Sequence, residues 1–233
     1  MRKNDDFKIA EELFTLSEPQ YQKFTASLLP TLKSENILGV RVPHLRKIAK
    51  RILKNGGAAD FLNALPHKYY EENYIHALLI SELEYSECIF RINSFLPYVD
   101  NWGVCDGLRP ACFSSNKDEL APKIATWLSS EHTYTVRFAI EMLMLHFLGD
   151  RFEKKFFDAV ASIRSEEYYL NMMIAWYFAT ALAERYDEAL PYLENHRFSA
   201  WVHNKIISKA RESLRISSAK KQYLNTLKIK MKG

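Results

Sequence analysis

Apolar residues recur at helical spacing along nearly the whole chain, and this periodicity is the feature that most limits its fold. No alternation of polar and apolar residues is long enough to predict a strand, so we predict an all-α protein. Val42-Pro43 is typical of a helix start, Gly56-Gly57 of a helix end, and Ser17-Glu18-Pro19-Gln20 of a capping box. The other predicted helices cover about residues 6–16, 21–32, 69–83, 85–96, 101–113, 117–129, 133–148, 151–164, 166–184, 187–195, 199–214 and 218–228.

The apolar helix cores also repeat. Tyr74–Leu79, Val136–Ile140, Met173–Trp176 and Val202–Ile207 are such cores, with a step of roughly 30 to 36 residues that is typical of a solenoid of helix pairs. No tetratricopeptide signature recurs, so we predict HEAT-like repeats in a right-handed superhelix with a concave face. Residues 1–233 are expected to form a single domain, in which about 217–233 is a basic C-terminal helix or tail.

The composition of the chain and the length of its uncharged stretches limit the cellular compartment in which we expect the protein. The 48% hydrophobic content is enough to bury a core without disulfides, and three cysteines make neither a disulfide framework nor a zinc pattern. The 16 uncharged residues from Tyr168 to Ala183 fall short of the roughly 20 that span a bilayer, which predicts a buried core helix. Residues 1–6 lead into an amphipathic segment instead of an apolar signal region. We therefore expect a cytoplasmic protein with no membrane partner.

The net charge of +4 is unevenly distributed. Residues 203–233 hold nine Lys and Arg and one acid, and residues 37–54 hold six and no acid. Two basic segments on an acidic remainder indicate a face that binds a polyanion. The alternative is that both segments are solvated helix surface. For either segment alone, a solvated surface is at least as common as a face that binds a polyanion.

Trp102 and Asp106 stand four residues apart and share one face if their segment is helical. An indole face and a carboxylate both attract positive charge, so the pair indicates a site for a cationic ligand. The alternative is structural, because an Asp near a Trp on a helix is more often a cap or an ion-pair partner.

Two further residues lie in helix cores of the following repeats. Arg137 needs a partner inside an apolar helix, and Glu141 at i+4 and an external phosphate are the two candidates. Trp176 is ambiguous, since an aromatic residue in so apolar a helix is more often part of the core. If the repeats stack regularly, we expect Asp106, Arg137 and Trp176 to converge on the concave face.

Four segments together carry a resemblance to a known family. They are Leu38-Gly39-Val40-Arg41-Val42-Pro43-x-Leu45-Arg46, Trp102-x-x-x-Asp106, Tyr134-Thr135-Val136-Arg137-Phe138-Ala139 and Tyr168-Tyr169-Leu170-Asn171-Met172-Met173-Ile174-Ala175-Trp176. In order and spacing, residues 37 to 215 resemble the AlkD-like DNA alkylation-repair glycosylases, which are built of HEAT-like repeats. The resemblance implies that Asp106 is the catalytic carboxylate, that Trp102 and Trp176 contact the lesion, and that Arg137 binds backbone phosphate. Arg41 and Arg46 are expected to bind phosphate as well.

The chemistry of alkylated purines agrees with these roles. Alkylation at N3 or N7 makes the base cationic and weakens its glycosidic bond, so a carboxylate stabilises the oxocarbenium-like sugar and orients water. We therefore expect a monomeric glycosylase for alkylated double-stranded DNA that needs no metal and no cofactor. Two alternatives stay open: a DNA-binding repeat protein for damaged or branched DNA without efficient excision, and a solenoid that binds acidic proteins.

Overall fold

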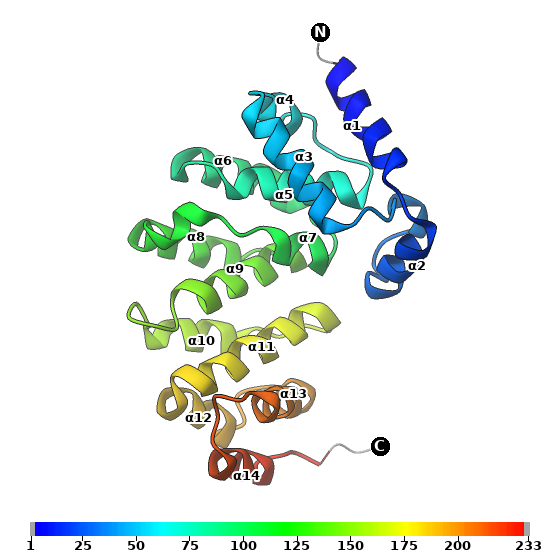
Figure 1. Cartoon of the computed structure of the whole chain (residues 1–233). Coiled ribbons are helices and arrows are strands. Elements are labelled where there is room, and N and C mark those ends of the chain that lie inside the picture. The colour runs from blue at the N-terminus through cyan, green and yellow to red at the C-terminus, as the bar shows by residue number, and fades with distance from the viewer. Residues whose placement is uncertain (1–2, 231–233) are drawn as a thin grey trace. The chain divides into compact units, whose positions relative to one another are not determined.

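The computed structural model describes residues 3–230, with side chains from residue 9 onward. Every regular element in this range is a helix, which confirms the all-α prediction (Figure 1). The chain forms two compact units, one up to Asn116 and the other from Lys117, called unit 1 and unit 2 below. Helices of a repeat protein contact mainly their neighbours, so such units also occur within one continuous array. The single-domain assignment therefore stays a prediction.

Unit 1 is built around a row of three helices. In this row α5 packs against both α3 and α7, while α4 and α6 also pack on α5. The helices of unit 1 are α1 (Lys3–Thr15), α2 (Pro19–Leu28), α3 (Val42–Lys54), α4 (Ala58–Leu62), α5 (Tyr70–Ser81), α6 (Tyr85–Phe95) and α7 (Trp102–Gly107), with short 3-10 helices at Ser34–Asn36, Leu96–Tyr98 and Ala111–Ser114.

Unit 2 contains a second row, in which α11 lies between α9 and α13 (Figure 1). Its helices are α8 (Lys117–Leu128), α9 (Thr133–His146), α10 (Lys154–Ser162), α11 (Tyr168–Glu184), α12 (Tyr186–Glu194), α13 (Ala200–Glu212) and α14 (Ser218–Thr226). Ala139 on α9 and Ala175 on α11 are fully buried, as expected for residues of the predicted helix cores. No helix within residues 3–230 is both long and apolar enough to cross a bilayer.

Three local predictions need correction. The helix expected over 101–113 ends at Gly107, because Pro110 lacks an N–H and disfavours a helical Arg109. The capping box at Ser17 does not form: Glu18 is the N-cap, without a side-chain cap, and its carboxylate pairs with Arg41 instead. The short helix α4 was not predicted at all, since five residues carry too little periodicity.

A buried carboxylate holds the segment that leads into α3. Glu71 is fully buried and accepts hydrogen bonds from the backbone N–H groups of Leu38, Gly39 and Val40. Burial raises the pKa of Glu71, and these three bonds act in the opposite direction. Gly39 adopts a φ of +83°, where its backbone touches the start of α2. The Leu38-Gly39-Val40 part of the family-like motif therefore has a structural role.

The C-terminal segment is anchored on α13 as far as the structure describes it. Asn204 donates to the carbonyl of Ile229 and accepts from its N–H, and a ring nitrogen of His203 bonds to the carbonyl of Leu227. α14 itself packs on α13. The last part of the predicted tail, residues 231–233, lies outside the described residues.

A half-buried histidine pairs with a fully buried one inside unit 1. His67 Nε2 and His76 Nδ1 are 2.8 Å apart, and His76 stacks on Phe95. Burial lowers the pKa of His67 from 6.5 to about 4. Burial, His67 and Arg91 lower that of His76 from 6.5 to about 3. Both rings are therefore neutral in the folded protein near neutral pH.

This pair is expected to make the protein acid-sensitive. Because the folded pKa values lie below the unfolded ones, the unfolded chain binds more protons once the pH falls below about 6.5. Each histidine should then lower the free energy of unfolding by up to about 1.4 kcal/mol per pH unit until its folded pKa is reached. Urea unfolding across this range should show a shallower slope in His67→Phe than in wild type, whatever its absolute stability. An unchanged slope would contradict the prediction.

Candidate functional site

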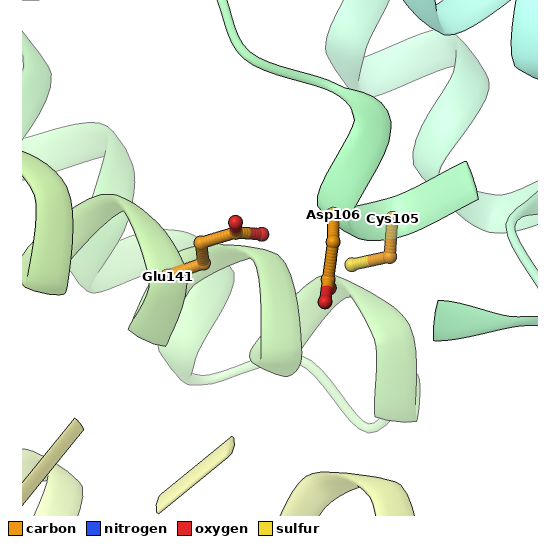
Figure 2. Close-up of side chains that lie close together, drawn as sticks. All are labelled: Cys105, Asp106 and Glu141. Carbon is orange, nitrogen blue, oxygen red and sulfur yellow. The ribbon is translucent and has the colours of Figure 1, made fainter. Parts of the chain in front are cut away.

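The short helix α7 positions Trp102 and Asp106. The side chain of Asn101 caps it by accepting from the N–H of Val104, and Trp102 is its first residue. Trp102 Nε1 donates to the carbonyl of Leu28 at 2.9 Å, so the indole is fixed against the end of α2. Asp106 lies one turn further along α7, next to Cys105 (Figure 2). Asp106 is half-buried and Cys105 is fully buried.

Trp102 and Asp106 open onto the same cavity of about 270 Å³ in unit 1, which we call the aromatic cavity. Asp106 is the one charged residue in its lining. The other walls come from α2, α5 and the start of α3. The lining residues are Tyr21, Phe24, Thr25, Leu28, Leu29, Val42, Tyr70, Tyr74, Trp102, Gly103, Asp106 and Gly107.

Two glycines let the aromatic wall approach α7. A Cβ on Gly103 would lie 3.0 Å from Tyr70 Oη, and one on Gly107 would lie 3.0 Å from Tyr74 Cε2. Both pairs are spaced by four residues, so two tyrosines of α5 meet two bare positions of α7. Burial raises the pKa of Tyr70, which keeps its hydroxyl protonated. The glycines, which cost helix stability, are explained by this close packing.

A larger depression in the same unit is lined by cations, and we call it the basic groove. Its volume is about 840 Å³, and it contains Arg46, Lys47, Lys50 and Arg109 against one acid, Glu82. Val42 and Gly107 line both the basic groove and the aromatic cavity, so the two adjoin. Their combination places an anion-attracting surface beside a single carboxylate.

The two arginines expected to bind phosphate have different surroundings. Arg46 is exposed in the basic groove and has no ion pair with any described residue. Arg41 forms two hydrogen bonds of 2.8 Å with the carboxylate of Glu18, and its guanidinium lies 4.8 Å from the centre of the Tyr21 ring. Arg41 thus braces the rim of the aromatic cavity, and its charge is partly compensated.

Arg137 lies within unit 2, on α9. It is only 4% exposed, and its Nη1 donates to the carbonyl of Tyr169 at 2.6 Å. Glu141 lies one turn further along α9 (Figure 2). It is fully buried. Tyr169 is a partner that neither of the two interpretations of Arg137 had named. The phosphate-binding role of Arg137 stays a prediction.

Trp176 is on the surface of unit 2 and does not belong to the core. It is 42% exposed in a helix whose other central residues are mostly buried, and it lines a pocket of about 320 Å³ with Lys209, Glu212 and Arg215. The ammonium of Lys209 lies 5.7 Å from the centre of its ring. This cation competes with any positively charged ligand for that ring. The lesion-binding role of Trp176 stays a prediction.

The structure therefore brings Trp102, Asp106 and Arg46 to adjoining depressions of one unit. Arg137 and Trp176 belong to the other unit, and their convergence with Asp106 stays a prediction. Sequence reasoning missed Tyr21, Phe24, Tyr70 and Tyr74. The spacing shared by the two tyrosines of α5 and the two glycines of α7 was the available signal.

Fold and site define an all-helical repeat protein with a cationic groove beside an aromatic, carboxylate-bearing cavity. This class of protein is suited to a polyanion that carries an aromatic group. A family model described as DNA alkylation repair enzyme matches residues 9–214, and the chain belongs to this family. No curated protein matches the chain. Membership supports a general role in the repair of alkylated DNA.

Proposed function

We propose that this protein hydrolyses the N-glycosidic bond of cationic N3- or N7-alkylpurines in double-stranded DNA. The observation that carries the proposal is the adjacency of the aromatic cavity, with its single carboxylate, and the basic groove, which has an excess of cations. Phosphates of the DNA backbone are assigned to the groove, and the damaged nucleotide to the cavity. Such an enzyme would act as a monomer on chromosomal DNA in the cytoplasm.

In this mechanism the alkylpurine leaves with the electron pair of the glycosidic bond, which neutralises its positive charge. Positive charge then develops on the deoxyribose, and the Asp106 carboxylate stabilises it. Water adds to C1′ and loses a proton to solvent. Trp102 offers its ring face to the cationic nucleotide, an interaction of roughly 0.5 to 2 kcal/mol. Arg137 and Trp176 would extend the contact to DNA.

The direct test measures release of 7-methylguanine and 3-methyladenine from methylated duplex DNA with enzyme in excess. Release by the wild-type protein supports the proposal. If the protein binds methylated and branched DNA but releases no base, DNA binding without efficient excision is the correct alternative. If it binds neither, the basic groove has another partner.

Arg46 should contribute more to DNA affinity than Arg41. Arg46→Ala removes a cation with no described ion pair from the basic groove, whereas Arg41→Ala removes one that is already bonded to Glu18. We expect Arg46→Ala to weaken binding uniformly across sequences and to reduce the slope of log affinity against log salt by about one. Arg41→Ala is the matched comparison and should change the slope less. Fluorescence anisotropy at several salt concentrations measures both, and equal slopes would contradict the assignment.

A further inference from the structure

The segment that follows α14 is held on α13 by side-chain hydrogen bonds. We call residues 227–230, which are not helical, the C-terminal strap. Asn204 Nδ2 donates to the carbonyl of Ile229 at 2.8 Å, and Asn204 Oδ1 accepts from the N–H of Ile229 at 2.9 Å. One side chain thus pairs both backbone groups of Ile229, as a neighbouring strand would. His203 Nε2 lies 2.8 Å from the carbonyl of Leu227 and, because a carbonyl only accepts, is the donor.

The C-terminal strap presents its two lysines to solvent. Leu227 and Ile229 are half-buried, whereas Lys228 and Lys230 are exposed, so apolar and basic residues alternate between the protein and solvent. Fixing a backbone costs conformational entropy, and the partial burial of two apolar side chains offsets only part of that cost. A basic segment that is ordered with so little buried surface indicates a role for its exposed side.

The charges of Lys228 and Lys230 are not compensated by any described residue. Neither lysine forms an ion pair with these residues or lies over one of their rings, whereas Lys220 on α14 lies 3.9 Å from the centre of the Tyr186 ring. No acidic residue occurs from position 213 to position 230. Two cations that are two residues apart on an anchored backbone therefore attract a polyanion, and its phosphates can pair with them.

We propose that the C-terminal strap is a second phosphate-binding element, in which Lys228 and Lys230 bind the backbone of duplex DNA and Asn204 positions them. The inference rests on the DNA substrate of the proposed function and adds a contact outside the basic groove and the aromatic cavity. An anchored strap loses less conformational freedom on binding than a loose tail would, which favours affinity. Because phosphate contacts do not read bases, the strap should bind methylated and unmethylated DNA alike.

Binding of an unmethylated duplex tests the two lysines. The double variant Lys228→Ala, Lys230→Ala should bind at least about tenfold more weakly at low salt, and its slope of log affinity against log salt should be smaller by about two. The matched control is the double variant Lys123→Ala, Lys154→Ala, which removes exposed lysines from α8 and α10 of the same unit. Fluorescence anisotropy at several salt concentrations measures all three proteins. An unchanged slope, or an equal loss in the control, overturns the inference.

A double-mutant cycle tests the positioning role of Asn204. Asn204→Ala removes both bonds to Ile229 and no charge. Hydrogen exchange of the Ile229 amide should therefore accelerate, and DNA affinity should fall about three- to tenfold. In the protein that lacks both strap lysines, the same substitution should change DNA affinity by less than about twofold, because nothing remains to be positioned. An equal loss in both proteins overturns the positioning role.

Asn225→Ala is the matched control for this cycle. Asn225 is exposed on α14 and forms no side-chain hydrogen bond with a described residue. Exchange of the Ile229 amide and DNA affinity should both stay at wild-type values in this variant. A loss of affinity in Asn225→Ala equal to that in Asn204→Ala would also overturn the positioning role.

The binding measurements keep this inference separate from the proposed function, since an unmethylated duplex holds no alkylpurine to release. If the wild-type protein releases base from methylated DNA but loss of both strap lysines leaves DNA affinity unchanged, the strap inference alone is overturned. If the wild-type protein releases no base and loss of both lysines weakens DNA binding, the glycosylase proposal fails and the strap is supported as a DNA contact.

Discussion

Replacing Asp106 by Asn should lower the rate of 7-methylguanine release from methylated duplex DNA by at least about 100-fold. Asn has nearly the same shape as Asp, so the aromatic cavity keeps its form and Trp102 its contact with Leu28. What is lost is the negative charge that stabilises the oxocarbenium-like sugar. DNA affinity should stay the same or rise slightly, because the change removes a charge of the same sign as phosphate. The measurement is a single-turnover rate together with a binding isotherm.

Asp60→Asn is the matched control for this experiment. Asp60 is an exposed acid on α4 of the same unit, and it lines neither the aromatic cavity nor the basic groove. The variant should release base at the wild-type rate. Equal rates for Asp106→Asn and wild type would remove Asp106 from the mechanism without disproving excision. A loss of DNA binding in Asp106→Asn would instead indicate that the substitution disturbs α7.

The second large effect is expected on stability. Gly39→Ala should lower the free energy of unfolding by about 3 kcal/mol or more, and the melting temperature by roughly 6 to 12 °C. The new Cβ would lie 2.5 Å from the backbone N of Gln22 and 2.6 Å from the carbonyl O of Glu18. Backbone atoms cannot rotate away, and the position also requires a φ of +83°. The segment held by Glu71 would have to shift away from α2.

The variant Gly56→Ala separates the steric cause, the clash with α2, from the conformational cause, the positive φ. Gly56 has a φ of +73°, and a Cβ there would meet nothing within 4 Å. This variant should therefore show only the conformational cost, about 1 to 2 kcal/mol. Thermal unfolding of both variants under identical conditions gives the difference that is due to the close approach of α2. If Gly39→Ala lowers the free energy of unfolding no more than Gly56→Ala does, α2 moves away from the new Cβ with little loss of stability, and the steric argument is wrong.

Several parts of the site were predictable because they depend on short stretches of chain. The pairing of Trp102 with Asp106 on one face follows from helical spacing, and the short helix α7 confirms it. The early end of α7 could also have been predicted from the sequence, because Gly107 and Pro110 are both unfavourable in a helix. Whether Trp176 lies in the core or on the surface could not be predicted from the sequence, because both a core and a surface residue fit the same apolar pattern.

Long-range contacts account for what sequence reasoning missed. Arg41 and Arg46 look equivalent along the chain, yet Arg41 pairs with Glu18, 23 residues earlier, and Arg46 faces the basic groove. Nothing local to Arg137 indicated the carbonyl of Tyr169, which lies 32 residues away. The aromatic cavity likewise combines residues of α2, α5 and α7.

The sequence by itself determined most of the helices, the apolar helix cores and the face shared by Trp102 and Asp106, since periodicity, capping and backbone sterics act over a few residues. It also carried the resemblance to DNA alkylation repair enzymes, which the family match confirms. Only the tertiary structure decided which aromatic side chains surround Asp106, which arginine is already paired and which tryptophan carries a cation on its ring. These properties depend on burial and charge contributed by residues distant along the chain, which packing alone brings together.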